Sequence, residues 1–208
     1  MGKEQGTMYY DEIFALPRKY SRHYTASKYY PLWLKALNKF KSVFDYYEQN
    51  ELFIKTVDFG CGPGQFADFL STECDYTQLS YVGIDFSSVA IKKCVPVLKK
   101  DKRFAFACSD AFKADKYVPE DISCVFSFEF LEHVENDLGL FDVINRRRVN
   151  GFHTFFIGSV PDFNSPGHVR HFANEDEVFD RYKDCFIDGT LKVKRELEHY
   201  FLITGYVK

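Results

Sequence analysis

Short apolar runs alternate with helically spaced apolar residues along most of the chain. The runs predict strands, which in chain order cover 53–59, 80–85, 103–108, 122–128 and 152–159, with one or two closing strands over 190–207. Apolar positions three and four apart predict the helices between them, over 64–70, over 87–100 with a bend at Pro96, over 131–144, and from a cap at Asn174 to about 184. Strands that alternate with helices indicate a doubly wound α/β fold, a mostly parallel sheet with helices on both faces.

The first 50 residues follow a different pattern. Residues 1–30 are polar and rich in tyrosine, with little period. Pro31 then starts a helix, because proline suits the first helical turn, and its apolar stripe consists of Trp33, Leu37, Phe40 and Phe44. We expect one globular domain overall, with an aromatic helical extension or lid over residues 1–50 and the sheet over residues 51–208.

Composition narrows the class of protein. The 208 residues are 46% hydrophobic and 27% charged, which is typical of a globular chain, and the formal charge of −3 argues against binding to duplex nucleic acid. The six cysteines form no CxxC pair, so a thiolate zinc site has no support and a reducing compartment is favoured. We also find no apolar run of the ~18 residues that a membrane span needs and no signal region, and we expect a cytoplasmic protein.

The strongest local signal is a glycine loop directly after the first strand. Gly60, Gly62 and Gly64 stand at alternate positions, so a ligand can approach bare backbone at the carboxyl end of that strand. The spacing differs from the G-x-G-x-x-G of dinucleotide sites, and no Gly-Lys-Ser/Thr of a phosphate loop is present. Asp58, just before the loop, would repel a phosphate and suits an amino group.

Two further acidic residues follow the next two strands. Asp85 ends the second strand, where a carboxylate can accept both ribose hydroxyls of a nucleoside. Asp110 follows the third strand, where it can accept a hydrogen bond from an adenine amino group. Together with the glycine loop, they predict a site for a nucleoside that carries an amino group.

Four motifs in this order, VDFGCGPGQF, YVGIDFS, SDAF and SFEFLEHV, resemble those of class I S-adenosylmethionine-dependent methyltransferases, over roughly residues 50–208. The resemblance implies a Rossmann-like fold with seven strands, S-adenosylmethionine as the cofactor and S-adenosylhomocysteine as the product. It also implies the cofactor contacts, which are Asp58, Phe59, Gly60, Gly62 and Gly64 near the methionine part, Asp85 on the ribose, Phe86 on the adenine, Asp110 and Ala111 at the adenine edge, and Ser127 at the reacting end.

The end of the fourth strand carries candidate chemistry. On a helix, Glu129, Glu132 and His133 would share one face, and two carboxylates with an imidazole can bind a divalent metal that lowers the pKa of an acceptor hydroxyl. This E-x-x-E-H pattern resembles that of the ubiquinone-pathway O-methyltransferases and of the small-RNA 3′-end 2′-O-methyltransferases, which implies a magnesium-type ion. The alternative is a helix that packs on the sheet without metal, with His133 as a catalytic residue beside the cofactor or substrate.

Two further segments supply candidate substrate contacts. In the loop 160–172, His168 is a candidate catalytic base, and Arg170 and His171 are candidates to hold a carboxylate, a phosphate or sugar hydroxyls. The alternative is a solvated loop. From the tyrosine-rich N-terminus we select Tyr20 and Tyr24 as acceptor contacts, and the alternative for that segment is a strap packed on the sheet edge.

We therefore predict a methyltransferase that acts on a small-molecule or saccharide acceptor at oxygen. The stretch Ser127-Phe128-Glu129-Phe130 lacks the [Asp/Asn]-Pro-Pro-aromatic motif of enzymes that methylate DNA bases or protein amides. Two alternatives stay open: an RNA-end 2′-O-methyltransferase with a divalent metal, and a cofactor-binding subunit without catalysis.

Overall fold

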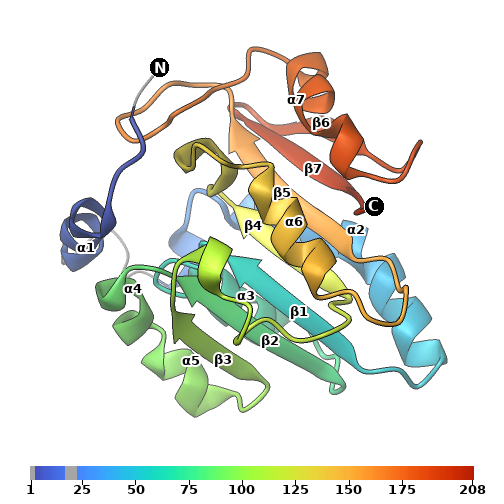
Figure 1. Cartoon of the computed structure of the whole chain (residues 1–208). Helices are drawn as coiled ribbons and strands as arrows, with labels where there is room; N and C mark the ends of the chain where they lie inside the picture. Colours follow the sequence, from blue (N-terminus) through green and yellow to red (C-terminus); the bar gives the residue numbers. More distant parts are fainter. Residues whose placement is uncertain (1–2, 17–22) are drawn as a thin grey trace.

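A seven-stranded sheet forms the centre of the molecule. The computed structural model describes residues 3–16 and 23–208. The strands are β1 (Ile54–Phe59), β2 (Leu79–Asp85), β3 (Phe104–Cys108), β4 (Cys124–Phe128), β5 (Phe155–Pro161), β6 (Lys192–Leu197) and β7 (Tyr200–Tyr206), in the order β3-β2-β1-β4-β5-β7-β6. The five strands from β3 to β5 are parallel, whereas β7 runs antiparallel to both of its neighbours (Figure 1). The predicted Rossmann-like, mostly parallel sheet is confirmed.

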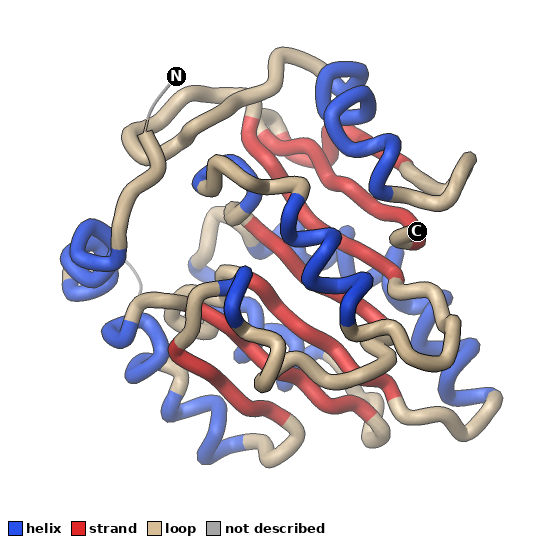
Figure 2. The backbone as a smooth tube through the Cα atoms, in the orientation of Figure 1, coloured by secondary structure: helices blue, strands red, loops and turns tan. Residues whose placement is uncertain are grey.

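Helices cover both faces of this sheet (Figure 2). They are α1 (Thr7–Ala15), α2 (Tyr30–Gln49), α3 (Gln65–Glu73), α4 (Ser88–Lys93), α5 (Val95–Lys100), α6 (Gly139–Arg146) and α7 (Glu175–Tyr182), with short 3-10 turns η1 (Tyr24–Ala26), η2 (Ala111–Lys113), η3 (Leu131–His133) and η4 (Lys183–Cys185). The apolar faces of α2 and α3 bury one face of the sheet, and those of α6 and α7 bury the other. None of the described helices is long and apolar enough to cross a membrane.

Two helical predictions are wrong in detail. The segment 87–100 is two helices that break at Cys94, with Pro96 in the first turn of the second, because proline lacks the N–H that a continuing helix would need. The segment 131–144 is the 3-10 turn η3 and a separate helix α6, and Val134 between them has extended backbone. Its helically spaced apolar residues are buried or half-buried, since the turn and the helix both face the sheet.

The N-terminal helix α1 was not anticipated. It stands apart from the sheet and packs beside α4, above the carboxyl ends of the parallel strands (Figure 1). Asp11 accepts hydrogen bonds from the Ser87 hydroxyl at 2.5 Å and from the Val89 amide at 3.3 Å, so it binds the first turn of α4. The Tyr9 hydroxyl also donates to the Pro166 carbonyl at 3.1 Å, which links α1 to the loop after β5.

Candidate active site

The glycine loop turns sharply at the end of β1. Gly60, Gly62 and Gly64 all have positive φ, at 75°, 52° and 78°, in the left-handed region that glycine adopts without strain. A Cβ atom on Gly60 would lie 2.6 Å from Cδ2 of Phe130, so no larger residue fits there. The loop therefore keeps bare backbone at the mouth of two neighbouring cavities.

The first of these, the β2–β3 cavity, has a volume of about 490 Å³, within the range of small-molecule sites. It is lined by the ends of β2 and β3, by the turns that follow β3 and β4, and by α1 with the residues before it. The predicted cofactor residues in its wall are Gly60, Asp85, Phe86, Asp110 and Ala111.

Asp85 is the charged centre of the β2–β3 cavity. One carboxylate oxygen accepts the Gly62 amide at 2.9 Å and the other accepts the Ser87 amide at 2.8 Å. Burial raises the pKa of Asp85 to about 6, and the two amide bonds oppose that shift. A carboxylate has roughly four acceptor positions, so about two are left for hydroxyl groups of a ligand.

The second cavity, which we call the aromatic cavity, has a volume of about 500 Å³. Rings make up much of its wall, namely those of Tyr9, Tyr10, Phe14, Tyr29, Trp33, Phe66, Phe128 and Phe163. Asp58 also lines it and accepts the Tyr81 hydroxyl at 2.5 Å, while burial raises the pKa of Asp58 to about 8. Five residues border both cavities, so the two meet at one junction, and these are Tyr10, Phe14, Gly60, Glu129 and His133.

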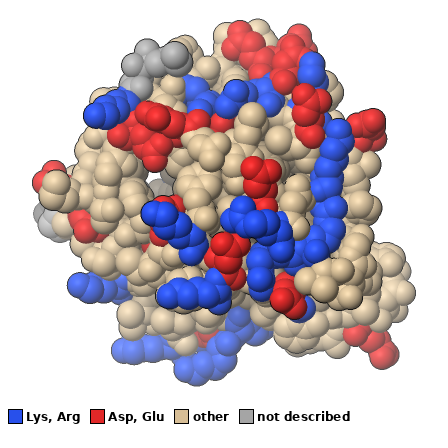
Figure 3. All heavy atoms as spheres, in the orientation of Figure 1, with Lys and Arg blue, Asp and Glu red and all other residues tan. Residues whose placement is uncertain are grey.

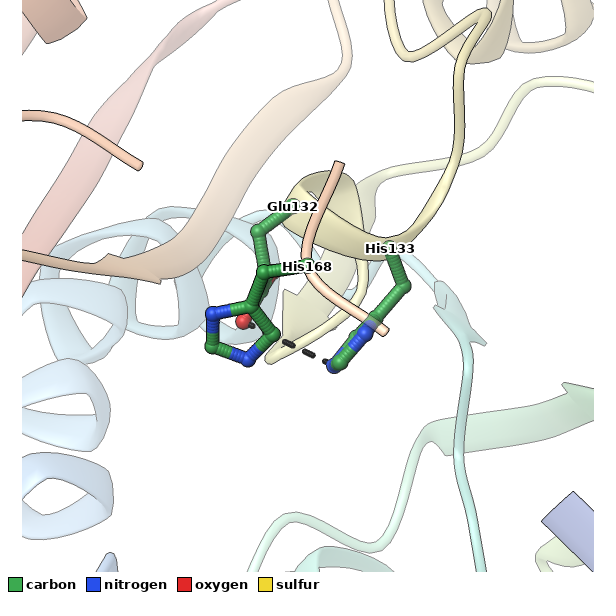
Figure 4. Close-up of side chains that lie close together, drawn as sticks. All are labelled: Glu132, His133 and His168. Atoms are coloured by element: carbon green, nitrogen blue, oxygen red, sulfur yellow. Dashed lines mark ion pairs between the residues drawn. The ribbon is translucent and has the colours of Figure 1, made fainter. Parts of the chain in front are cut away.

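Three ligating side chains converge beside this junction (Figure 4). Glu132 and His133 come from η3 and His168 from the loop after β5, and one potential ligand atom of each lies within 4.8 Å of the others. His133 Nδ1 is 3.0 Å from the Gly167 carbonyl, and His168 Nδ1 is 3.1 Å from the Phe163 carbonyl. Since each Nδ1 donates its hydrogen to a carbonyl, each Nε2 keeps its lone pair when the ring is neutral.

The environment keeps both imidazoles neutral near pH 7. Burial lowers the pKa of His133 to about 4 and lowers the pKa of His168 as well. The cluster therefore offers two unprotonated Nε2 atoms, and both histidines line the aromatic cavity.

Glu132 lies behind the two histidines with an unsatisfied carboxylate. The residue is completely buried, and neither of its oxygens accepts a hydrogen bond from any residue that the structure describes. The nearest ring nitrogen, His133 Nε2, is 3.9 Å from Oε1. Burial, with the charge of Glu129 next, raises the pKa of Glu132 well above its ordinary value. A buried carboxylate without hydrogen-bond partners is stabilised by a bound cation or by protonation.

Glu129 does not belong to this cluster. The helix on which it was expected to share a face with Glu132 and His133 does not form, because Glu129 has a φ of 55° and η3 begins only at Leu131. Its carboxylate instead accepts the Tyr29 hydroxyl at 3.3 Å and the Ser159 hydroxyl at 3.5 Å. The structure thus brings His168 into the place that the sequence prediction assigned to Glu129.

Comparisons with known proteins agree with this site. Residues 56–147 match the family model of a methyltransferase domain. An S-adenosylmethionine-dependent methyltransferase from Aquifex aeolicus has a TM-score of 0.58 at 16% identity, over 74% of this chain and 82% of that one. The N-methyltransferase NodS from Bradyrhizobium japonicum, in complex with S-adenosylhomocysteine, has a TM-score of 0.63 at 14% identity, over 97% of both chains. The chain carries a methyltransferase domain over residues 56–147 and has the fold of the class I S-adenosylmethionine-dependent methyltransferases.

A third structure, a DhpI complex with S-adenosylhomocysteine, has a TM-score of 0.59 at 15% identity, over 95% of this methyltransferase and 93% of that chain. No curated protein sequence matches the methyltransferase at a significant level. Both NodS and DhpI are in complex with S-adenosylhomocysteine, the product of the cofactor that the sequence motifs of this chain imply.

The β2–β3 cavity of the methyltransferase fits that cofactor. Asp85 has acceptor capacity for ribose hydroxyls, and Phe86 offers a ring in the same wall. Gly60 and Gly62 have no side chains to occupy the space beside the junction, and a Cβ on Gly60 would clash with Phe130. Asp58, which the sequence motifs predict near the methionine part, lines the adjoining aromatic cavity.

Three predicted cofactor residues line neither cavity. Phe59 is fully buried in the core on the α6 side of the sheet. Gly64 precedes α3 and faces Cys94. Ser127 is fully buried within β4, and since side chains alternate along a strand, it faces the layer opposite to Phe126 and Phe128. Just beyond the strand, Glu129 borders both cavities and Phe130 lines the β2–β3 cavity.

Of the two tyrosines predicted to contact the acceptor, the structure describes only Tyr24. Tyr20 lies outside the described residues. Tyr24 is only 4% exposed and belongs to the core under α2 and α3, with its hydroxyl bonded to Glu73 at 2.8 Å, so it lines neither cavity. The aromatic wall instead comes from Tyr9, Tyr10 and Tyr29, together with Trp33 of α2. The tyrosine-rich composition of residues 9–30 pointed to this segment, but the choice of Tyr24 within it did not match the cavity wall.

Arg170 and His171 also line neither cavity. Arg170 donates from Nη1 to backbone carbonyls around η3, those of Leu131 and Val134, so this nitrogen faces backbone. His171 is exposed beside it. Of the three polar residues chosen from this loop, only His168 faces the aromatic cavity.

Proposed function

We propose that this methyltransferase transfers the methyl group of S-adenosylmethionine to an oxygen of a small-molecule or saccharide acceptor bound in the aromatic cavity. The Glu132–His133–His168 cluster carries the proposal. His133 borders both cavities and His168 lines the aromatic cavity, so the cluster lies beside the proposed acceptor site. A hydroxyl must give up a proton when it is methylated, and a neutral imidazole within reach can accept it.

The cluster also fits a divalent cation. A carboxylate without hydrogen-bond partners and two imidazoles, each oriented by a backbone carbonyl through Nδ1, form a donor set typical of metal ligands. Glu132, His133 and His168 would hold the ion, in place of the predicted set that included Glu129. When bound, a divalent cation lowers the pKa of a hydroxyl next to it.

Methyl transfer also needs the acceptor to be positioned and water to be excluded, because the methyl carbon is already activated. We propose that α1 and the residues before it cover the junction as a lid. Tyr10 borders both cavities, with its ring centroid 5.3 Å from that of Phe86 and 5.7 Å from that of His133. The Glu4 carboxylate accepts the Glu135 amide at 2.7 Å, which ties the start of this segment to the turn after η3.

The walls and volume of the aromatic cavity support a compact acceptor. A ring-lined space of about 500 Å³ suits a small molecule or a sugar unit whose apolar face packs on aromatic rings. The charge distribution on the surface does not favour RNA. On the face in Figure 3, basic side chains are mixed with acidic ones. Arg146 pairs with Asp115, and Arg147 pairs with Glu120. RNA-end methylation would show as a strongly salt-dependent affinity for single-stranded RNA.

The test is transfer of radiolabelled methyl from S-adenosylmethionine to a panel of polyhydroxylated and aminated small molecules and saccharides, with the methylated atom located by NMR. We expect methyl ethers, loss of turnover in EDTA, and recovery with Mg²⁺ or Mn²⁺. Methylation only at nitrogen, as the name of NodS describes for that neighbour, would overturn the assignment to oxygen. Full turnover in EDTA would eliminate the metal and leave the histidines as the candidate bases.

A further inference from the structure

The Glu132–His133–His168 cluster is assembled from two loops that are far apart in sequence. η3 follows β4, whereas His168 lies in the loop that follows β5. We infer that Arg170 is the positioning residue that joins these loops and sets the geometry of the cluster. This inference rests on the proposed function, and it assigns Arg170 a role other than the acceptor binding expected from the sequence.

Arg170 binds the backbone that surrounds η3. Its Nη1 donates to the carbonyls of Leu131 at 2.6 Å and Val134 at 2.5 Å, and its Nη2 donates to the carbonyl of Glu135 at 2.8 Å. These three carbonyls flank Glu132 and His133 on both sides. A planar guanidinium can satisfy several acceptors at once, whereas the single nitrogen of a lysine cannot reproduce that fork.

The residues just before Arg170 extend the same junction. The Val169 amide donates to the Glu132 carbonyl at 2.8 Å, and the Gly167 carbonyl lies 3.0 Å from His133 Nδ1. His168 lies between these two contacts, and its ring centroid is 4.8 Å from that of His133. The position of His168 therefore depends on how the segment 167–170 is held against η3.

Asp137 secures Arg170 from behind. It is fully buried, and its Oδ2 lies 3.2 Å from Arg170 Nη1. Oδ1 also pairs with Arg181 Nη2 at 2.6 Å, and Oδ2 accepts the Tyr182 hydroxyl at 2.8 Å. The carboxylate compensates the guanidinium charge in a site where Arg170 is only 16% exposed, and it connects the junction to α7.

This arrangement offers a matched pair of variants. Arg170→Lys keeps the charge but loses the fork. Arg181→Lys changes an arginine that binds the same carboxylate but, within the described part of the chain, donates to no carbonyl of η3. Two measurements compare them with the wild type: the Kd for Co²⁺, from its visible absorption, and the crystal structure. The Kd for S-adenosylhomocysteine, from calorimetry, reports on the cofactor cavity.

We expect Arg170→Lys to weaken Co²⁺ binding by about 10–100-fold, as loss of an outer-shell partner of a metal site does, and to move His168 away from His133. Binding of S-adenosylhomocysteine should stay within about twofold, since Arg170 does not line the β2–β3 cavity. Arg181→Lys should leave Co²⁺ binding and the cluster as they are. Unchanged Co²⁺ affinity and unchanged ring positions in Arg170→Lys would overturn the inference, and so would equal losses in the two variants.

Metal binding by the cluster and the positioning role of Arg170 can be refuted independently of each other. If the wild type binds no Co²⁺, the metal part of the proposed function is wrong, and the crystal structures alone decide whether Arg170→Lys displaces His168 from its 4.8 Å contact. If Arg170→Lys does not fold, Arg170→Gln takes its place, because it buries no unpaired ammonium and reaches fewer carbonyls. The same displacement is expected there, and its absence contradicts the role.

Discussion

Glu132→Gln should make the protein more stable while it removes activity. In the wild type, a fully buried carboxylate without hydrogen-bond partners among the described residues faces the lone pairs of two Nε2 atoms. The glutamine amide has the same shape, carries no charge and supplies two N–H donors toward His133 and His168. The substitution therefore removes an unfavourable arrangement that only a cation or a proton relieves.

The size of the effect follows from the cost of an unsatisfied buried polar group, which is about 1–3 kcal/mol. For a chain of this length, each kcal/mol raises the melting temperature by about 2–4 °C. We would measure thermal unfolding by calorimetry in EDTA without cofactor, so that neither ligand contributes. Turnover of the same variant should be lost, because the glutamine amide cannot ionise and cannot bind a cation as the carboxylate does.

Asp137→Asn is the matched control. Asp137 is as deeply buried as Glu132, but it is paired with Arg170, Arg181 and Tyr182. Breaking such a pair typically costs about 3–5 kcal/mol, so this variant should unfold at a lower temperature. Equal or lower stability of Glu132→Gln relative to the wild type would refute the reasoning, since it would mean that a proton on Glu132 already relieves the cost of its burial.

Three further outcomes follow. Affinity for S-adenosylhomocysteine should fall as the pH drops through about 6, because burial raises the pKa of Asp85 to about 6 and its protonation removes an acceptor for the ribose hydroxyls. Calorimetry at pH 5 and 7.5 measures this affinity, and Asp85→Asn should make it less dependent on pH. Gly60→Ala should weaken cofactor binding at least about tenfold, since its Cβ would push Phe130 into the cavity and the left-handed backbone would cost about 1–2 kcal/mol more; an unchanged Kd would contradict this. Tyr24→Phe should cost about 1 kcal/mol of stability through its lost bond to Glu73, and any change in kcat would show that Tyr24 is more than a core residue.

The order of elements and the location of the cofactor site could be read from the sequence. Apolar runs bounded by glycine and acidic residues predict strands whose carboxyl ends share one edge of a parallel sheet, because each crossover returns the chain to the same end. Gly60, Asp85 and Asp110 were therefore expected at one site, and the structure places all three in the wall of the β2–β3 cavity. Local patterns determine this much, since they depend on period and turn chemistry.

The pattern was less informative where the chain leaves a strand. The apolar spacing after β4 fits a continuous helix, yet Glu129 takes a left-handed backbone and η3 begins two residues later. Periodicity reports which residues face the core, and a 3-10 turn followed by a helix can bury the same residues. For this reason the prediction that Glu129, Glu132 and His133 share one helix face was wrong.

What only the tertiary structure decided is how the separate loops meet. The sequence by itself determined the fold class and the strand ends at which Gly60, Asp85 and Asp110 meet, and it offered Glu132, His133 and His168 as candidate chemical groups. It could not show that His168 replaces Glu129 beside the other two, or that Arg170 binds backbone instead of acceptor, because residues 34 or more positions apart are brought together by sheet order and by hydrogen bonds between loops. Such contacts carry no local period, so the geometry of the site becomes readable only once the chain is folded.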